Sequence, residues 1–243
     1  MLKIFANEQL VADEIKKEML TGLAVEQPVF CLASGSTPAK GYHLFAKMSS
    51  KDKNIHKLKI VSLDEWVGVD QKNSGSCYQM LDNDLFSKLN LHQKQVNFYN
   101  GMATNLQEEC ERIDDFIAKQ PLTFSLMGVG MNGHIGLNEP GFSPLNHSSV
   151  VELSETTKAV AQKYFTEYFP LKQGLTLGLK QIINSKRVVV VITGLHKAEI
   201  VKEIFTNQAL KLPAQSLLGH EHIDFYLDEL AAKHLNLKAR GLI

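Results

Sequence analysis

The sequence predicts an α/β fold: a Rossmann-like, doubly wound, mostly parallel sheet with helices on both faces. Short apolar runs alternate along the chain with segments whose apolar residues recur at helical spacing, which is typical of strands joined by helices. These runs are continuous rather than alternating, as in strands buried on both faces. Glycine or small polar residues follow several of them. A chain of 243 residues without linker or repeat is expected to form one domain over 1–243.

The elements follow in order along the chain. Strands are predicted over residues 1–5, at an edge of the sheet, and then over 28–33, 58–63, 96–99, 122–127, 148–153, 187–192, 213–218 and 222–227. Helices are predicted over 8–23, 39–48, 77–89, 106–119 and 198–205. Residues 150–175 are expected to form a lid within the domain, with a mobile helical cover over 155–172; a peripheral helix packed on the core is the alternative.

The strand after the first helix ends in a small-hydroxyl loop, Ser34, Gly35, Ser36, Thr37 and Pro38. Pro38 fits the first turn of the next helix, and Ser36 or Thr37 fits its N-cap. Backbone N–H groups, hydroxyls and the helix dipole attract an anion to such a junction. An ordinary capped turn is the alternative, and the lack of a Walker lysine argues against a nucleoside triphosphate.

Two other strand ends carry charged side chains. The third predicted strand ends in Asp64 and Glu65, and this is a good location for a catalytic carboxylate in an open α/β sheet. A capping or ion-paired role on a loop is the alternative. The valine-rich strand leads through Gly194 to Lys197 at a helix start, where a lysine opposes the helix dipole unless an anion binds beside it.

The stretch Leu126–Gly141, LMGVGMNGHIGLNEPG, is the densest in unusual residues. It holds five glycines around His134 and Glu139, and glycine lets backbone approach a ligand closely. An imidazole and a carboxylate suit general acid–base catalysis near neutral pH. Gly128–Gly133 also matches the dinucleotide pattern G-x-G-x-x-G, but no helix start follows, so this match is weak. A structural histidine in a glycine turn is the simpler alternative, which the density of these residues disfavours.

In a parallel sheet these four strand ends lie at one edge, so they are expected to converge on a single cleft. Such a cleft would have two anion-binding helix starts, a lysine, a histidine and several carboxylates. This combination suits a small phosphorylated, polyhydroxylated substrate and proton transfer, with no cofactor required.

Composition limits the other classes of partner. Lys plus Arg and Asp plus Glu are both 26, so no global charge attracts nucleic acid or an anionic membrane. No apolar stretch is long enough to cross a bilayer, and the N-terminal residues lack a signal-peptide pattern. Three widely spaced cysteines predict neither disulfides nor a zinc site, and a single strand bearing His220, His222 and Asp224 seldom makes a metal site. We therefore expect a cytoplasmic protein without a metal.

Four blocks of the sequence resemble the glucosamine-6-phosphate deaminase/isomerase family. They are SGSTP at 34–38, LDEW at 63–66, GVGMNGHIGLNEPG at 128–141 and TGLHKA at 193–198. The match is collinear and spans nearly the whole chain, and its third block is highly specific. The resemblance implies that an amino sugar 6-phosphate and water give a ketose 6-phosphate and ammonia.

The roles implied by this resemblance fall on matching residues. Asp64 is implied as the base that moves a proton between C2 and C1 of the open-chain sugar, His134 as the ring-opening acid and base, and Glu139 as its orienting partner. Asn132 stands where many members have Asp; it cannot ionise but can still hydrogen-bond the imidazole. The sugar phosphate is expected to be bound by Ser34, Gly35, Ser36, Thr37, Gly130, Lys163 and Lys197.

Two further substitutions separate this chain from many members of the family. Lys163 stands at a lid position that is usually Arg, so it keeps the charge but loses the bidentate fork. Trp66 stands where Tyr is common, which bears on the sugar pocket. The chain resembles the short, unregulated bacterial members, so we expect a monomer or small homo-oligomer without allosteric control by N-acetylglucosamine 6-phosphate.

Several functions stay open at this point. The leading hypothesis is conversion of glucosamine 6-phosphate to fructose 6-phosphate and ammonia, and a galactosamine 6-phosphate enzyme giving tagatose 6-phosphate is the nearest alternative. A 6-phosphogluconolactonase-like hydrolase would not need Asp64 to remove a C2 proton. A non-catalytic sugar-phosphate sensor shares the fold, but such sensors carry a helix-turn-helix module, and Asp64, His134 and Glu139 together favour catalysis.

Overall fold

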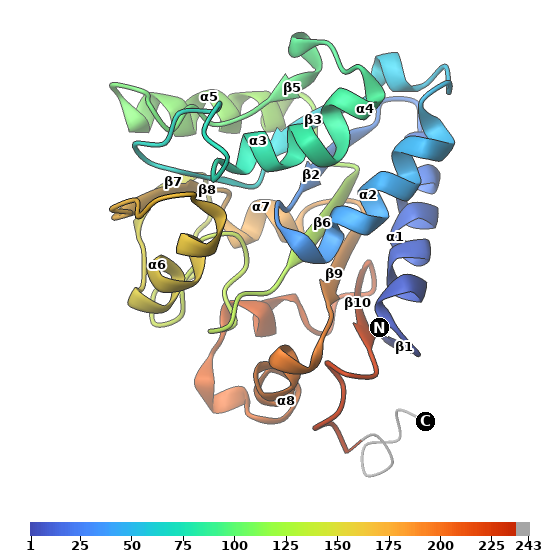
Figure 1. The fold of residues 1–243 in the computed structure, drawn as a ribbon, viewed down its shortest axis with the longest axis vertical. Coiled ribbons are helices and arrows are strands. Elements are labelled where there is room, and N and C mark those ends of the chain that lie inside the picture. Colours follow the sequence, from blue (N-terminus) through green and yellow to red (C-terminus); the bar gives the residue numbers. More distant parts are fainter. Residues whose placement is uncertain (237–243) are drawn as a thin grey trace.

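A seven-stranded parallel sheet forms the middle layer of the protein, whose computed structural model describes residues 1–236 (Figure 1). Its strands lie side by side in the order β1 (Leu2–Phe5), β10 (Ile223–Asp228), β9 (Val188–Ile192), β6 (Phe124–Gly128), β2 (Val29–Leu32), β3 (Lys59–Ser62) and β5 (Val96–Asn97). Every neighbouring pair in this sheet is parallel, and β1 lies at an edge. The predicted Rossmann-like fold is confirmed.

Strand β9 shows why the buried strands are continuous apolar runs. Side chains of Val188, Val190 and Ile192 pack into one hydrophobic cluster, and those of Val189 and Val191 pack into the other, on the opposite face. All five are buried. Because successive side chains of a strand point to opposite faces, a strand covered by helices on both sides must be apolar at every position.

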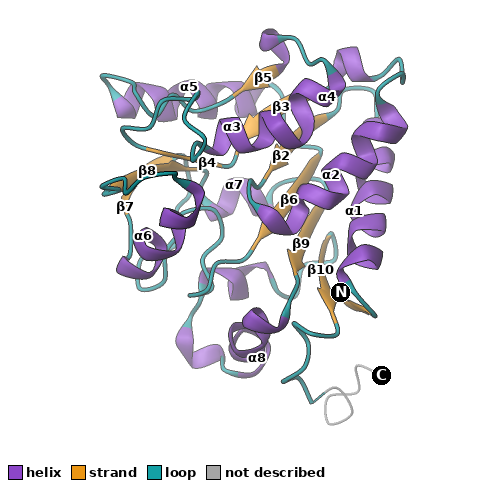
Figure 2. Cartoon of the chain, in the orientation of Figure 1, coloured by secondary structure: helices purple, strands orange, loops and turns teal. Residues whose placement is uncertain are grey.

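Two sets of helices supply the covering layers (Figure 2). The cluster on one face takes its helical residues from α1 (Glu8–Leu23), α2 (Ser36–Ser49), α3 (Cys77–Leu81) and α4 (Ser87–Leu89). The cluster on the other face takes them from α5 (Leu106–Lys119), α7 (Leu179–Ile183) and α8 (Ala198–Thr206). A π-helical turn, Asp82–Phe86, joins α3 to α4, so the helix predicted over 77–89 is one continuous helical segment. Within residues 1–236, no helix has the length and apolar character needed to cross a membrane.

A second, antiparallel sheet stands beside the main one. Its strands are β4 (Asp64–Trp66), β8 (Gln173–Thr176) and β7 (Ser149–Glu152), in that order. The strand predicted over 148–153 therefore exists but belongs to this sheet rather than to the parallel one. The chain leaves β3, kinks, and enters β4, so Asp64 sits where the two sheets meet.

The helix predicted over 155–172 is wrong in extent. Helix α6 covers only Glu155–Ala161, and a 3-10 turn, Gln162–Tyr164, ends it. The side chain of Gln162 then bonds the backbone N–H and C=O of Phe169, at 3.0 and 2.9 Å. Phe165 and Phe169 stack with ring centroids 5.1 Å apart. These contacts fold the segment back into a loop in place of further helix.

The strand predicted over 213–218 is also wrong. Residues Pro213–Leu217 form a 3-10 helix that begins with proline. Proline at the first helical position loses no hydrogen bond, and the side chain of Gln215 accepts one from the Leu212 N–H at 2.7 Å. These local bonds satisfy the backbone without a partner strand.

Candidate active site

A cavity of about 260 Å³ opens at the carboxyl ends of the parallel strands. Its walls come from the loops after β2, β3, β6 and β9, together with α6 and the turn that follows. β2 and β6 are neighbours at the point where the strand order reverses, the usual ligand site of such sheets. Every site residue predicted from the sequence lines this cavity except Glu139, which is buried behind it.

The ring of His134 occupies a place that only glycine at position 130 allows. A Cβ atom on Gly130 would lie 2.2 Å from Nε2 of His134. The Gly130 N–H donates to the His134 carbonyl at 3.1 Å, and Gly133, at φ 82°, turns the chain between them. The predicted substrate-binding glycine therefore has a positioning role of its own: it makes room for the imidazole.

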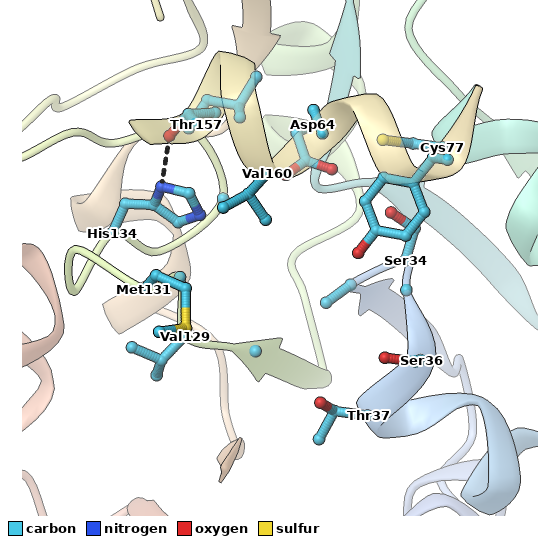
Figure 3. Close-up of a pocket in the computed structure, with 18 of the residues that line it drawn as sticks. Ser34, Ser36, Thr37, Asp64, Cys77, Val129, Met131, His134, Thr157 and Val160 are labelled. Atoms are coloured by element: carbon cyan, nitrogen blue, oxygen red, sulfur yellow. Dashed lines mark hydrogen bonds between the residues drawn. The ribbon is translucent and has the colours of Figure 1, made fainter. Parts of the chain in front are cut away.

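Two oxygen atoms lie close to Nδ1 of His134. The Thr157 hydroxyl is 3.1 Å away, shown as the dashed line in Figure 3, and Glu139 Oε2 is 3.5 Å away. The Thr157 hydroxyl hydrogen goes to Glu139, so its oxygen accepts from His134. Nδ1 therefore carries the hydrogen, and Nε2, next to Gly130 at the cavity wall, is the nitrogen that can accept a proton.

Asn132 binds the groups around the imidazole and not the imidazole itself, which corrects the expectation from the sequence. Its Nδ2 donates to Glu139 Oε2 at 2.7 Å and to Ser154 Oγ at 3.2 Å. Its Oδ1 accepts from the backbone N–H of His134 at 3.3 Å. The amide therefore ties the glutamate to the loop that carries the histidine.

Glu139 is held as a carboxylate. Burial by itself would raise its pKa, but hydrogen bonds from His134, Thr157 and Asn132 outweigh burial and lower the pKa to about 2. The backbone N–H of Ser154 adds a fourth donor at 3.3 Å. A fixed negative charge beside Nδ1 favours a protonated imidazole, as expected of an orienting partner.

Asp64 faces the same cavity, between His134 and Cys77 in Figure 3. Burial, and then the negative charge of Glu65, raise its pKa to about 7, while a hydrogen bond from the Cys77 thiol opposes the shift. A carboxyl group with this pKa is partly ionised at neutral pH, so it can both accept and return a proton.

Glu65 has the structural role that was the alternative for the acidic pair. It is fully buried, and its carboxylate accepts from the Ser76 hydroxyl at 2.6 Å. Backbone N–H groups of Trp66, Cys77 and Tyr78 also donate to it, at 2.9, 3.0 and 3.1 Å. It therefore caps the start of α3 and leaves Asp64 as the carboxyl group of the cavity.

The small-hydroxyl loop after β2 forms the opposite wall. Gly35, at φ 102°, is the N-cap of α2, so the helix begins at Ser36; the prediction that Ser36 or Thr37 would cap it is wrong. No side-chain capping bond forms there. Figure 3 places Ser34, Ser36 and Thr37 along this wall, where their hydroxyls and the helix start make an anion site.

Two lysines bring positive charge to this anion site. Lys197 donates to the Val129 carbonyl at 2.6 Å, and burial, then the charge of Lys163, lower its pKa to about 8. Burial and both lysines also lower the pKa of His196. In the described part of the chain no carboxylate pairs with either lysine, so an anionic ligand would relieve their repulsion.

Reasoning from the sequence missed Ser154, Thr157, Tyr164 and Cys77. Ser154 and Thr157 had a local signal, since Ser154 is the N-cap of α6 and accepts from the Thr157 N–H. Tyr164 and Cys77 line the cavity through tertiary contacts alone. Trp66, which was expected to bear on the sugar pocket, donates its indole N–H to the Gly75 carbonyl at 3.1 Å, so this donor is already used.

The histidines near β10 do not gather into a metal site. His222 Nε2 lies 2.7 Å from the Ile183 carbonyl, and Asp224 pairs with Arg187 at 2.8 Å. The structure over residues 1–236 contains no group of three or more metal-ligating side chains.

The fold and this cavity define an acid–base enzyme of the doubly wound α/β class that acts on a small phosphorylated substrate. The chain belongs to the family of glucosamine-6-phosphate isomerases/6-phosphogluconolactonase, whose family model matches residues 6–225. The family resemblance noted in the sequence is confirmed.

Curated relatives agree with this family. A glucosamine-6-phosphate deaminase of Streptococcus pyogenes is 34% identical over 84% of this chain and 86% of its own length. A glucosamine-6-phosphate deaminase of Clostridium botulinum is 33% identical over 86% of this chain and 88% of its own length.

Solved structures agree as well. A monomeric glucosamine-6-phosphate deaminase superposes with a TM-score of 0.89 at 28% identity, covering 96% of this chain and 99% of that one. The 6-phosphogluconolactonase of Thermotoga maritima superposes with a TM-score of 0.73 at 19% identity, covering 94% and 98%. This second likeness shows the fold alone.

Proposed function

We propose that the protein is an aldosamine-6-phosphate deaminase/isomerase that converts glucosamine 6-phosphate and water to fructose 6-phosphate and ammonia. One observation carries the proposal: Asp64, with a pKa of about 7, and His134, with Nε2 at the cavity wall, face one cavity beside an anion site. The naming of both curated relatives as glucosamine-6-phosphate deaminases supports the substrate.

The proposed reaction begins with ring opening. His134 Nε2 takes the proton of the C1 hydroxyl and returns it to the ring oxygen, with Glu139 and Thr157 stabilising the transient imidazolium. Asp64 then removes the C2 proton as His134 protonates O1, which gives an enolamine. Asp64 returns its proton to C1, leaving an iminium at C2. Water adds to C2, and ammonia leaves, so the ketose forms with no oxidant or cofactor.

The phosphate in this proposal lies against Ser34, Gly35, Ser36 and Thr37 at the start of α2. The helix dipole and hydroxyls favour an anion there. Lys197, with its pKa lowered to about 8 by burial and by Lys163, becomes fully charged when a phosphate arrives. Binding and charging are therefore coupled.

The lid over 150–175 is part of the same proposal. Thr156, Thr157, Val160, Ala161, Lys163 and Tyr164 all come from this segment and line the cavity. Movement of the segment would admit substrate and then exclude water. We further propose a cytoplasmic location, because a sugar phosphate does not cross a bilayer unaided, and a monomer or small homo-oligomer.

The experiment that tests the proposal compares glucosamine 6-phosphate and galactosamine 6-phosphate as substrates, without added metal. Ammonia and ketose 6-phosphate are measured together. The expected result is equimolar formation of both products from glucosamine 6-phosphate, and slower turnover of the epimer. Tight binding of either sugar phosphate without ammonia release would instead assign the protein to the non-catalytic sensors. Lactone hydrolysis that survives Asp64→Asn would favour a lactonase.

A further inference from the structure

Tyr164 connects the proposed lid to the anion site. It ends the 3-10 turn after α6, and its hydroxyl oxygen lies 3.1 Å from the place where a Cβ atom on Gly35 would stand. Gly35 is the N-cap of α2. The lid therefore contacts the anion site through a tyrosine hydroxyl, and the glycine leaves room for that hydroxyl.

The hydroxyl of Tyr164 lies at the cavity without a partner. In the structure of residues 1–236 it makes no hydrogen bond, although the residue is partly buried and lines the cavity. Burial, then the charges of Cys77 and Asp64, raise its pKa, so the hydroxyl keeps its proton at neutral pH. A hydrogen-bond donor is thus available beside the helix start that attracts anions.

Lys163 adds to this arrangement. Its ammonium lies 4.9 Å from the centroid of the Tyr164 ring, a cation–π contact. A lysine presents a point charge and lacks the paired donors of arginine's fork. A tyrosine hydroxyl on the next residue can supply the second donor from the same turn, aimed at the same wall.

We propose that Tyr164 is a substrate-binding residue whose hydroxyl donates a hydrogen bond to the phosphate group held at Gly35, Ser36 and Thr37. Together, Lys163 and Tyr164 give the lid one charge and one directed donor, so a bound phosphate holds the lid closed. This inference rests on the phosphate site of the proposed function.

The test is Tyr164→Phe, which removes one oxygen and keeps the ring that Lys163 contacts. KM for the sugar phosphate is expected to rise about tenfold, with kcat within about twofold, because a hydrogen bond to a charged group is lost. The inhibition constant of inorganic phosphate should rise by the same factor. Tyr168→Phe is the matched control: its ring is 81% exposed and lies in the same segment, so both constants should stay unchanged.

Each outcome decides the matter. Unchanged KM and phosphate inhibition in Tyr164→Phe would overturn the inference. A fall in kcat at constant KM would also overturn it and would place the hydroxyl in proton transfer near Asp64. If the unmodified protein turns over neither amino sugar, the proposed function fails by itself. Calorimetric titration with inorganic phosphate then tests Tyr164 independently, and weaker binding to Tyr164→Phe than to the unmodified protein supports the inference.

Discussion

Asn132 donates a hydrogen bond to Glu139 at 2.7 Å, and so holds the carboxylate that lies beside the imidazole of His134. The partner of Glu139 at this place is therefore a neutral amide. One negative charge, and not two, acts on the imidazole. This relationship sets the proton affinity of the histidine, because each additional carboxylate nearby would favour the charged ring.

Asn132→Asp should raise the pKa of His134. Two carboxylates so close cannot both stay ionised unless a cation lies between them, and the imidazolium is the nearest one. We expect an increase of about one pH unit or more in the titration midpoint of His134, followed by NMR of the ring carbons. Asn83→Asp, on the far end of the π-helical turn, is a control that should leave this midpoint in place. An unchanged midpoint in Asn132→Asp would mean that the new carboxyl group takes up a proton itself.

His134→Ala should lower kcat by about 100-fold or more, the usual scale for a general acid–base group. The imidazole is the group whose Nε2 meets the cavity, so no neighbour replaces it. Steady-state kinetics of ammonia release measure the effect. His147→Ala is the control, because that side chain is 78% exposed and lies outside the cavity. An undiminished kcat in His134→Ala would end the assignment of this residue to catalysis.

Much of this site was predictable from where strands end. A parallel sheet brings the carboxyl ends of its strands to one edge, so residues after β2, β3, β6 and β9 had to meet once those strands were recognised. The strands themselves were recognisable because burial on both faces requires continuous apolar runs, as in Val188–Ile192. The position of Lys197 beside the small-hydroxyl loop follows from these two rules.

Other parts depend on contacts between distant segments. β4 pairs with β8, which joins Asp64 to Thr176, and no local pattern in either segment specifies the partner. Residues 213–218 were misread because an apolar run of that length suits both a strand and a buried turn. The hydrogen bond from His134 to Thr157 also joins separate segments, so the sequence could indicate a catalytic histidine but not what orients it.

The pH dependence of catalysis should follow Asp64. A general base must be ionised, and burial together with Glu65 raises the pKa of Asp64 to about 7. We therefore expect kcat/KM to rise with pH through a limb centred near 7, measured from about pH 5 to 9. A limb centred near the ordinary aspartate pKa of about 4 would contradict this assignment.

Asp64 should also make the folded protein less stable above neutral pH. Its folded pKa lies above the unfolded value of 3.8, so the folded state binds more protons between these values. The free energy of unfolding therefore falls as pH rises through this window. Asp64→Asn should raise the free energy of unfolding at pH 8 by about 1–3 kcal/mol, below the ceiling of about 4 kcal/mol for an unscreened shift of this size. Denaturant unfolding measures it, and exposed Asp115→Asn should change it by less than about 0.5 kcal/mol.

Thr157→Val separates the orientation of the imidazole from its presence. Valine keeps the shape of the buried threonine, but Nδ1 of His134 loses the hydroxyl at 3.1 Å and retains only Glu139 at 3.5 Å. A less directed imidazole spends less time with Nε2 aligned, so kcat should fall about tenfold while KM changes little. Thr206→Val, at the exposed end of α8, is the matched control. Nitrogen-15 NMR of His134 should show a smaller population with hydrogen on Nδ1. If kcat falls and this tautomer population does not, Thr157 acts through packing; if both fall, the hydroxyl orients the catalytic ring.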